Sequence, residues 1–293
     1  MNTRDLEYFI KLVEYKNYTR VAKEFSVSQP SITQAIQRLE KEFNTQLVKQ
    51  DRTHQKTVIT RTGLLLNKNA ILIDNYLKLT HREIDNANNK KIRLGLPPII
   101  GTLYFPQVAG KLMQAGLLKM TEVVESGSDE LLKMLRKGDV DVALLGSVRP
   151  MGFSEIDSVQ LGSRPFVIIA SPDNPVATKQ QISFKELGNQ SFVNLSGRFV
   201  HPVAFQAYCE YANINPQIVY ESTDIAWVKS LVKANLGISL IVKDAVHPED
   251  VLKSLEITDP VPVSFNISAA IRSGYVLSET EEKFLAIIKE MKI

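Results

Sequence analysis

Polar side chains between residues 29 and 41 have the types and spacing that suit contact with nucleic acid. One helix face would carry Pro30, Ser31, Gln34, Gln37, Arg38 and Lys41. Amide, hydroxyl and basic groups of this kind can meet base edges and phosphates in a DNA major groove. The opposite face is apolar, at Ile32, Ile36, Leu39 and Phe43. An ordinary amphipathic helix with a solvated outer face would look the same, so the neighbouring elements must decide.

A helix, a short turn and a second helix would hold that face in place. Thr19 is expected to cap the first helix, and Ser26 and Val27 to form the turn. Ser28 is expected to cap the second helix, and Pro30 falls in its first turn, where a missing N–H costs little. A preceding helix would pack behind the pair through its own apolar stripe, Leu6, Phe9, Ile10 and Val13. These elements predict a helix-turn-helix.

The segment after Phe43 predicts a two-stranded wing with a polar tip, DRTHQKT. Arg52 and Lys56 are the residues expected to touch sugar–phosphate there, with His54 as a weaker candidate. The alternative is that the tip of the wing is only exposed to solvent and contacts no DNA.

One long helix is predicted from about Thr62 to Asn86. It carries two apolar stripes, Leu65, Leu72 and Leu79 with Tyr76, and Leu66, Ile73, Leu77 and Ile84. Two stripes favour two partners, the N-terminal module and the same helix of a second subunit. A single-partner core helix remains the alternative. A dimer matters because paired recognition helices one DNA turn apart read a near-palindrome.

Charge is unevenly distributed along the 293 residues. Residues 1–63 hold 11 Lys/Arg and 7 Asp/Glu, a net charge of +4, whereas residues 64–293 hold 24 and 25. The positive excess therefore lies where phosphates would be neutralised. Cys209 is the only cysteine, which excludes an intramolecular disulfide, and no zinc spacing occurs. We expect no cofactor and no metal, and a soluble cytoplasmic protein without a signal peptide or membrane span.

The C-terminal two hundred residues alternate short apolar runs with helical patterns. The runs lie at 92–96, 121–125, 141–145, 166–171, 191–195, 217–221 and 238–242. Such alternation predicts parallel sheets with crossover helices, here in two α/β lobes. We expect lobe I at 92–162 and 266–293 and lobe II at 163–265, with a hinge near Gly162 and Phe265. A ligand would then bind between the lobes, beyond the strand ends.

Loops after these strands supply the candidate ligand contacts. Hydroxyl groups come from Thr102, Ser147, Ser196 and Thr223. Arg198 and His201 would add positive charge, which suits a carboxylate. Ordinary capping and turn chemistry is the alternative for each of these residues.

Taken together, the chain resembles a LysR-type transcriptional regulator over essentially its whole length. The motif residues are Ala22, Ser28, Gln29, Pro30, Ser31, Gln34, Ile36, Leu39 and Glu40, and LLKMLRKGDVDVALLG and LVKANLGISLI match two further family patterns. The resemblance implies a winged helix-turn-helix domain (1–61), a long dimerisation helix (62–91) and a two-lobed regulatory domain like a periplasmic binding protein (92–293). It also implies DNA contacts by Gln29, Pro30, Ser31, Thr33, Gln34 and Arg38.

Partners follow from the same resemblance: operator DNA, a small effector, a second subunit as homodimer or homotetramer, and RNA polymerase as a further candidate. The opening MNTRDLEYF and the wing region also resemble regulators of malolactic fermentation, which would make L-malate the effector. The loop after the apolar run at 92–96 departs from the family pattern. Pro97 and Pro98 remove two backbone N–H donors there, so the expected ligand contact shifts to Thr102.

Other functional classes compete with this interpretation. An enzyme is disfavoured, because no nucleophile elbow, phosphate loop, HExxH or acid–base pair occurs. A solute-binding protein would leave the helix pair unexplained. A cytoplasmic sensor of a non-carboxylate ligand, acting as a repressor, is the remaining alternative.

Overall fold

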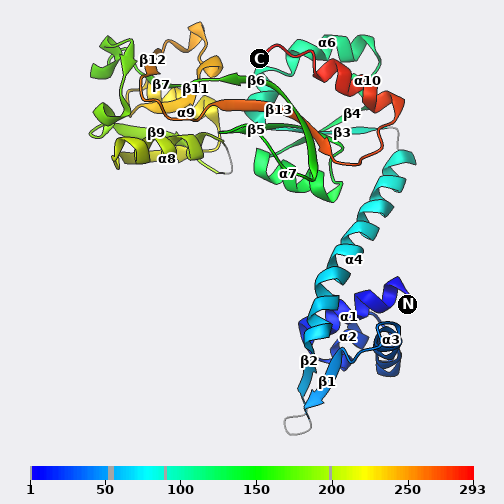
Figure 1. Ribbon diagram of the computed structural model, residues 1–293. Coiled ribbons are helices and arrows are strands. Elements are labelled where there is room, and N and C mark those ends of the chain that lie inside the picture. The colour runs from blue at the N-terminus through cyan, green and yellow to red at the C-terminus, as the bar shows by residue number, and fades with distance from the viewer. Residues whose placement is uncertain (1, 52–55, 89–90, 198–199) are drawn as a thin grey trace. The chain divides into compact units, whose positions relative to one another are not determined.

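Helices and a small antiparallel sheet make up the N-terminal part of the computed structural model, which describes residues 2–51, 56–88, 91–197 and 200–293. The order is α1 (Thr3–Tyr15), α2 (Tyr18–Glu24), α3 (Gln29–Glu42), β1 (Val48–Asp51), β2 (Lys56–Ile59) and α4 (Arg61–Asn88) (Figure 1). The chain divides into two units, Met1–Asn88 and Asn89–Ile293.

Local sequence signals explain most of the helix pair. Ser28 caps α3, since its hydroxyl accepts from the Ser31 N–H at 3.3 Å. Ile32, Ile36 and Leu39 are buried, as predicted. Two expectations were wrong. Asn17 caps α2 in place of Thr19, because the helix begins at Tyr18 and Thr19 already lies inside its first turn. Phe43 is 45% exposed, because α3 ends at Glu42 and Phe43 is already its C-cap.

Helix α4 packs on the N-terminal core through its first turns only. Gly63 and Ala70 are buried there, and Leu66 packs against the same core. A side chain at Gly63 would place its Cβ 2.4 Å from the Leu47 carbonyl oxygen, so only glycine fits this junction. Most apolar side chains along the rest of α4 are exposed, among them Leu72 at 50% and Tyr76 at 68%, whereas Leu79 is half-buried.

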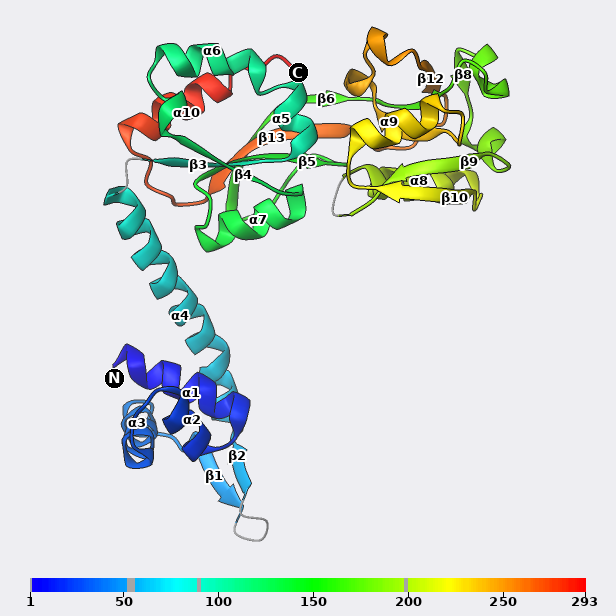
Figure 2. The same ribbon diagram turned by 180° about the vertical axis from the view of Figure 1, so that it is seen from behind.

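Lobe I of the second unit is built on a mixed sheet of order β4-β3-β5-β13-β6. Strand β3 (Ile92–Leu96) runs parallel to β4 (Thr121–Glu125) and β5 (Val142–Ser147), whereas β13 (Phe265–Arg272) is antiparallel to β5 and β6 (Ile156–Arg164). Helices α6 (Pro106–Gln114) and α10 (Glu279–Ile288) lie on one face, α7 (Ser128–Lys137) lies on the other, and α5 (Pro98–Leu103) follows β3 (Figures 1 and 2).

Lobe II carries two sheets. Its strands are β7 (Phe166–Ala170), β8 (Gln181–Ile182), β9 (Ser191–Leu195), β10 (Gln217–Ser222), β11 (Ser239–Val242) and β12 (Lys253–Ile257). They form a mixed four-stranded sheet of order β11-β7-β12-β8 and the parallel pair β10-β9. Strands β9 and β10 are parallel, and a bridge from Phe192 to Ile238 brings β9 alongside the segment that leads into β11. Helices α8 (Val200–Ala212) and α9 (Ile225–Lys233) accompany these sheets. Short 3-10 turns occupy Leu118–Met120 (η1), Pro175–Thr178 (η2), Phe184–Leu187 (η3), Lys243–Ala245 (η4) and Pro248–Asp250 (η5).

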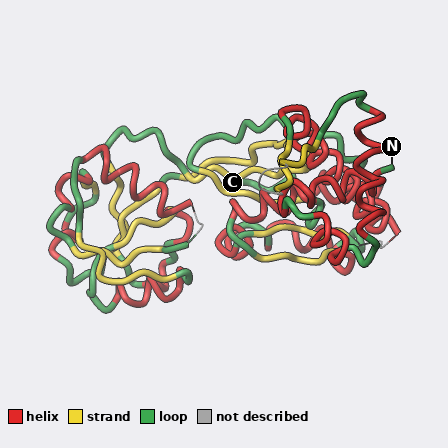
Figure 3. Tube along the Cα trace, turned by 90° about the horizontal axis from the view of Figure 1, so that it is seen from below, coloured by secondary structure: helices red, strands yellow, loops and turns green. Residues whose placement is uncertain are grey.

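The two lobes are joined by strands that cross between them (Figure 3). Strand β6 ends at Arg164 and β7 begins at Phe166, while β13 returns from Phe265, which pairs with Arg164. The expected parallel pairing occurs between β3 and its neighbours β4 and β5 and between β9 and β10, but β7 pairs antiparallel with both β11 and β12. Strands β6, β8 and β12 were not predicted. Across the residues that the structure describes, no helix combines the length and apolar character needed to span a membrane.

Candidate DNA interface and effector site

The outer face of α3 carries the residues predicted to contact DNA. Gln29, Pro30 and Gln34 are exposed, whereas Ser31 and Thr33 are half-buried. The Ser31 hydroxyl lies 2.8 Å from that of Ser28, and the Thr33 hydroxyl donates to the Gln29 carbonyl oxygen at 3.2 Å. The Gln34 amide is therefore the group most available for base edges, since Gln29 Nε2 donates to the Thr33 hydroxyl at 3.5 Å and the hydroxyls also stabilise the first turn.

Arg38 is held by an acidic residue of α1. Its Nε and Nη2 donate to Asp5 Oδ2 and Oδ1 at 3.0 and 2.6 Å, and the Asp5 side chain is only 2% exposed. The Arg38 hydrogen bonds lower the pKa of the Asp5 carboxyl. About half of the Arg38 side chain remains exposed, at 52%. Removing Arg38 would leave a buried carboxylate without its counter-charge, so such a variant changes stability as well as any DNA contact.

The wing predictions lie mostly beyond what the structure describes. Arg52 and His54 fall in residues 52–55, outside the described ranges, and Lys56 is described only as the first residue of β2. Glu40, near the end of α3, contacts the start of the wing, and the sequence did not predict this contact. Its carboxylate accepts from the N–H groups of Leu47 and Val48 at 2.8 and 3.2 Å, which ties α3 to the start of β1. Its presence in the family motif was the available signal.

The predicted effector residues fall into separate places in the second unit. Ser147 ends β5 in lobe I, next to Gly146, where a Cβ would lie 3.0 Å from Val200 Cγ2 of lobe II. The lobes therefore meet between Ser147 and the start of α8. Ser196 N–H donates to the Ser222 carbonyl oxygen at 2.9 Å, which brings Ser196 beside Thr223. Thr102 is exposed on α5 and its hydroxyl donates to the Pro98 carbonyl oxygen. Arg198 lies outside the described residues.

His201 does not supply the positive charge expected of it. Its side chain is buried among Phe166 and Phe265, with ring centroids 5.5 and 5.6 Å away. Burial lowers the pKa of His201 to about 3, and Nε2 accepts from the Val242 N–H at 3.2 Å. The imidazole is therefore neutral and carries its proton on Nδ1. Nδ1 has no hydrogen-bond partner among the described residues, which leaves a buried donor unused.

The sequence also did not predict a hydrogen-bonded link between the two lobes. Tyr104, at the end of α5, donates to Asp244 Oδ2 of η4 at 3.1 Å, and Arg164 Nε donates to the same oxygen at 2.8 Å. Burial and the nearby Asp244 carboxylate raise the pKa of Tyr104, so its phenol stays protonated. No sequence signal could join residues that lie 140 positions apart. Within the described residues no cluster of His, Cys, Asp or Glu could hold a metal ion.

Known proteins share both parts of this arrangement. Residues 3–64 match the bacterial regulatory helix-turn-helix protein of the lysR family, and residues 85–292 match the LysR substrate binding domain. The malolactic fermentation system transcriptional activator of Lactococcus lactis subsp. lactis is 33% identical over 294 residues, covering 100% of this chain and 99% of its own. The hydrogen peroxide-inducible genes activator of Haemophilus influenzae is 27% identical, covering 99% and 97%.

The fold has counterparts among solved structures. HinK, a LysR family transcriptional regulator from Pseudomonas aeruginosa, matches with a TM-score of 0.58 and 22% identity, covering 99% of this chain and 97% of that chain.

A helix-turn-helix joined to an effector domain defines a class, the DNA-binding transcription regulators that respond to an effector. Within that class, this chain belongs to the LysR family. Like its relatives, this chain is a transcription regulator and not an enzyme.

Proposed function

We propose that this regulator binds a near-palindromic operator as a dimer or tetramer and responds to a small carboxylate, with L-malate as the first candidate. The observation that carries the effector proposal is the 33% identity, over both complete lengths, to a malolactic fermentation activator. We further propose RNA polymerase as the partner through which DNA binding alters transcription.

The proposed DNA contacts are Gln29, Pro30, Ser31, Thr33, Gln34 and Arg38 on α3, with Arg52 and Lys56 from the wing. The exposed glutamine amides support base readout, since an amide can pair bidentately with adenine. The net charge of +4 over residues 1–63 supports phosphate contact.

The proposed effector contacts are Thr102, Ser147, Ser196, Arg198, His201 and Thr223. Ser147 and His201 have the best support, because the lobes approach each other between the end of β5 and the start of α8. A neutral His201 can still donate its Nδ1 proton to a carboxylate oxygen, and Arg198 would supply the positive charge.

Exposed apolar side chains along α4 support the dimer. They are Leu64, Leu65, Ile71, Leu72, Ile73, Tyr76, Leu77 and Ile84. A helix that leaves so much apolar surface in water is expected to cover it with a partner, here the same helix of a second copy.

Leu72→Glu should therefore weaken dimer formation by at least about tenfold, because an unpaired carboxylate is costly to bury. Analytical ultracentrifugation over a dilution series measures the change. His81→Glu is the matched control, since His81 is exposed and lies on the opposite side of α4. Equal dimer dissociation constants for the two variants would show that Leu72 is not at the interface.

Thermal unfolding with L-malate, D-malate, citrate and an aromatic acid tests the effector. A ligand at about 100 times its dissociation constant stabilises the native state by about 2.7 kcal/mol, a shift of several degrees. We expect L-malate alone to produce it. Ser147→Ala should reduce this shift, and Thr178→Ala, which removes an exposed hydroxyl on η2, should retain it. No shift with any acid would overturn the carboxylate proposal and favour a non-carboxylate ligand.

A further inference from the structure

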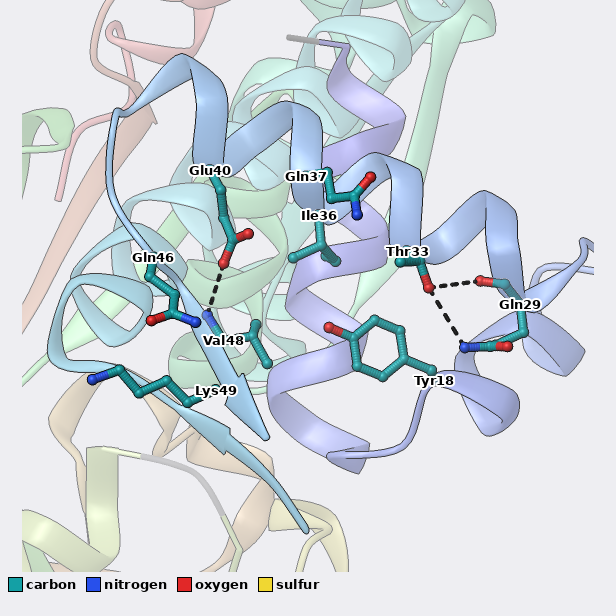
Figure 4. A pocket seen from close by; sticks show the side chains of 9 residues that line it. All are labelled: Tyr18, Gln29, Thr33, Ile36, Gln37, Glu40, Gln46, Val48 and Lys49. Atoms are coloured by element: carbon teal, nitrogen blue, oxygen red, sulfur yellow. Dashed lines mark hydrogen bonds between the residues drawn. The ribbon is translucent and has the colours of Figure 1, made fainter. Parts of the chain in front are cut away.

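A polar groove of about 610 Å³ separates α3 from the first strand of the wing. Figure 4 shows it from close by, with Gln29, Thr33 and Gln37 on the α3 side and Gln46 and Lys49 on the wing side. Tyr18, the first residue of α2, lies between the two sides. Because Gln29 and Thr33 are also proposed DNA contacts, the groove begins where the recognition helix would meet the duplex.

The charges around the groove favour an anion. Glu40 is the one acidic residue among the described residues that line it, and its carboxylate is engaged by the N–H groups of Leu47 and Val48. Lys49 is exposed and forms no ion pair with any residue that the structure describes. The lysine is thus the cation available in the groove, with a strongly hydrated ammonium suited to a phosphate.

Uncharged donors complete the lining. Gln37 and Gln46 are exposed, and neither side-chain amide has a hydrogen bond to another described residue, although the Gln46 backbone carbonyl oxygen accepts from Thr60 and Thr62. Tyr18 is half-buried, and its phenol also lacks a hydrogen-bond partner in the described part of the chain. Burial and the charge of Glu40 raise the pKa of Tyr18, so it remains a donor at neutral pH.

We propose that this groove binds the sugar–phosphate backbone of one DNA strand, with Lys49 pairing with a phosphate and Tyr18, Gln37 and Gln46 donating to backbone oxygens. A recognition helix that reads base edges in the major groove has the phosphates of the flanking strands along its sides. A polar cleft between that helix and the wing is therefore placed to receive one strand. The inference rests on the proposed mode of DNA binding and adds four residues to it.

Salt dependence of binding to a short duplex of unrelated sequence tests the groove without knowledge of the operator. Each phosphate contact contributes about 0.9 to the slope of log affinity against log salt concentration. Lys49→Gln should lower that slope by about 0.9 for each bound subunit. Tyr18→Phe keeps the ring and the charge, so it should weaken binding by about tenfold at fixed salt and leave the slope unchanged.

Lys283→Gln provides the matched control, because it removes the same charge from an exposed position on α10 in the other unit. Circular dichroism melts verify that each variant folds like the wild type. A Lys49→Gln slope equal to that of Lys283→Gln would overturn the groove assignment while leaving the DNA-binding function in place. A wild-type protein without affinity for any duplex would instead overturn the proposed function itself.

Discussion

Asp141→Ala should destabilise the second unit of the chain, Asn89–Ile293 (the regulatory unit), by about 3–5 kcal/mol. This is the range seen when one partner of a buried ion pair is removed. Asp141 directly precedes β5 and is 2% exposed. Its carboxylate accepts from the Arg93 backbone N–H at 2.9 Å, from Nε at 3.1 Å and from Nη2 at 2.6 Å. The alanine variant would leave the Arg93 guanidinium, whose side chain is 21% exposed, with the Gly138 carbonyl oxygen as its one hydrogen-bond partner among the described residues.

Urea unfolding followed by Trp227 fluorescence measures this loss. Trp227 is the single tryptophan of the chain and lies on α9, so its emission reports on the regulatory unit. Asp173→Ala is the control, because Asp173 is exposed and a surface change of this kind typically stays within about 0.5 kcal/mol. A midpoint for Asp141→Ala that matches the control would show that the Arg93 pair contributes little to folding.

Mild acid should destabilise the protein through His201. The pKa of His201 is lowered by burial from 6.5 to about 3 in the folded chain. Above the unfolded value the imidazole is neutral in both states, and it has no effect. As the pH falls below 6.5, His201 binds a proton in the unfolded state but not in the folded state. The free energy of unfolding therefore decreases by about 1.4 kcal/mol per pH unit until the pH nears the folded value.

His201→Gln should remove this dependence, because glutamine does not titrate and its carbonyl oxygen can still accept from the Val242 N–H. Between about pH 7.5 and pH 5.5 we expect the wild type to lose about 1.4 kcal/mol more than the variant, measured by urea unfolding with Trp227 emission. His81→Gln, at an exposed position on α4, should behave as the wild type. Equal losses in wild type and His201→Gln would show that His201 titrates normally.

Local sequence rules predicted α3, the proposed recognition helix, closely. The Ser28 cap, Pro30 in the first turn and the buried row of Ile32, Ile36 and Leu39 all depend on neighbours within a few residues. Where the rules failed, the error was small. The cap of the first helix of the pair is Asn17, two residues before the predicted Thr19, and Phe43 is the C-cap of α3, where helical periodicity ends.

The same local rules predict strands and their pairing less well, as the regulatory unit shows. Strands β3, β4 and β9 occur where apolar runs predicted them. Strand β6 was missed because it has no continuous apolar run: only Ile156 is buried, and its other residues are half-buried or exposed. Strand direction was also wrong in lobe II, since pairing between β7, β11 and β12 depends on connections that span tens of residues.

The sequence by itself determined the class of protein, because a helix-turn-helix motif, a two-stripe helix and family patterns are each written within short segments. Only the tertiary structure decided how individual side chains are used. Asp5 and Arg38 are 33 positions apart, so their pairing could not be read from spacing. His201 is neutral because the fold buries it between distant strands, and desolvation disfavours the charged imidazole. Charge state and pairing follow from burial, which the order of residues alone does not specify.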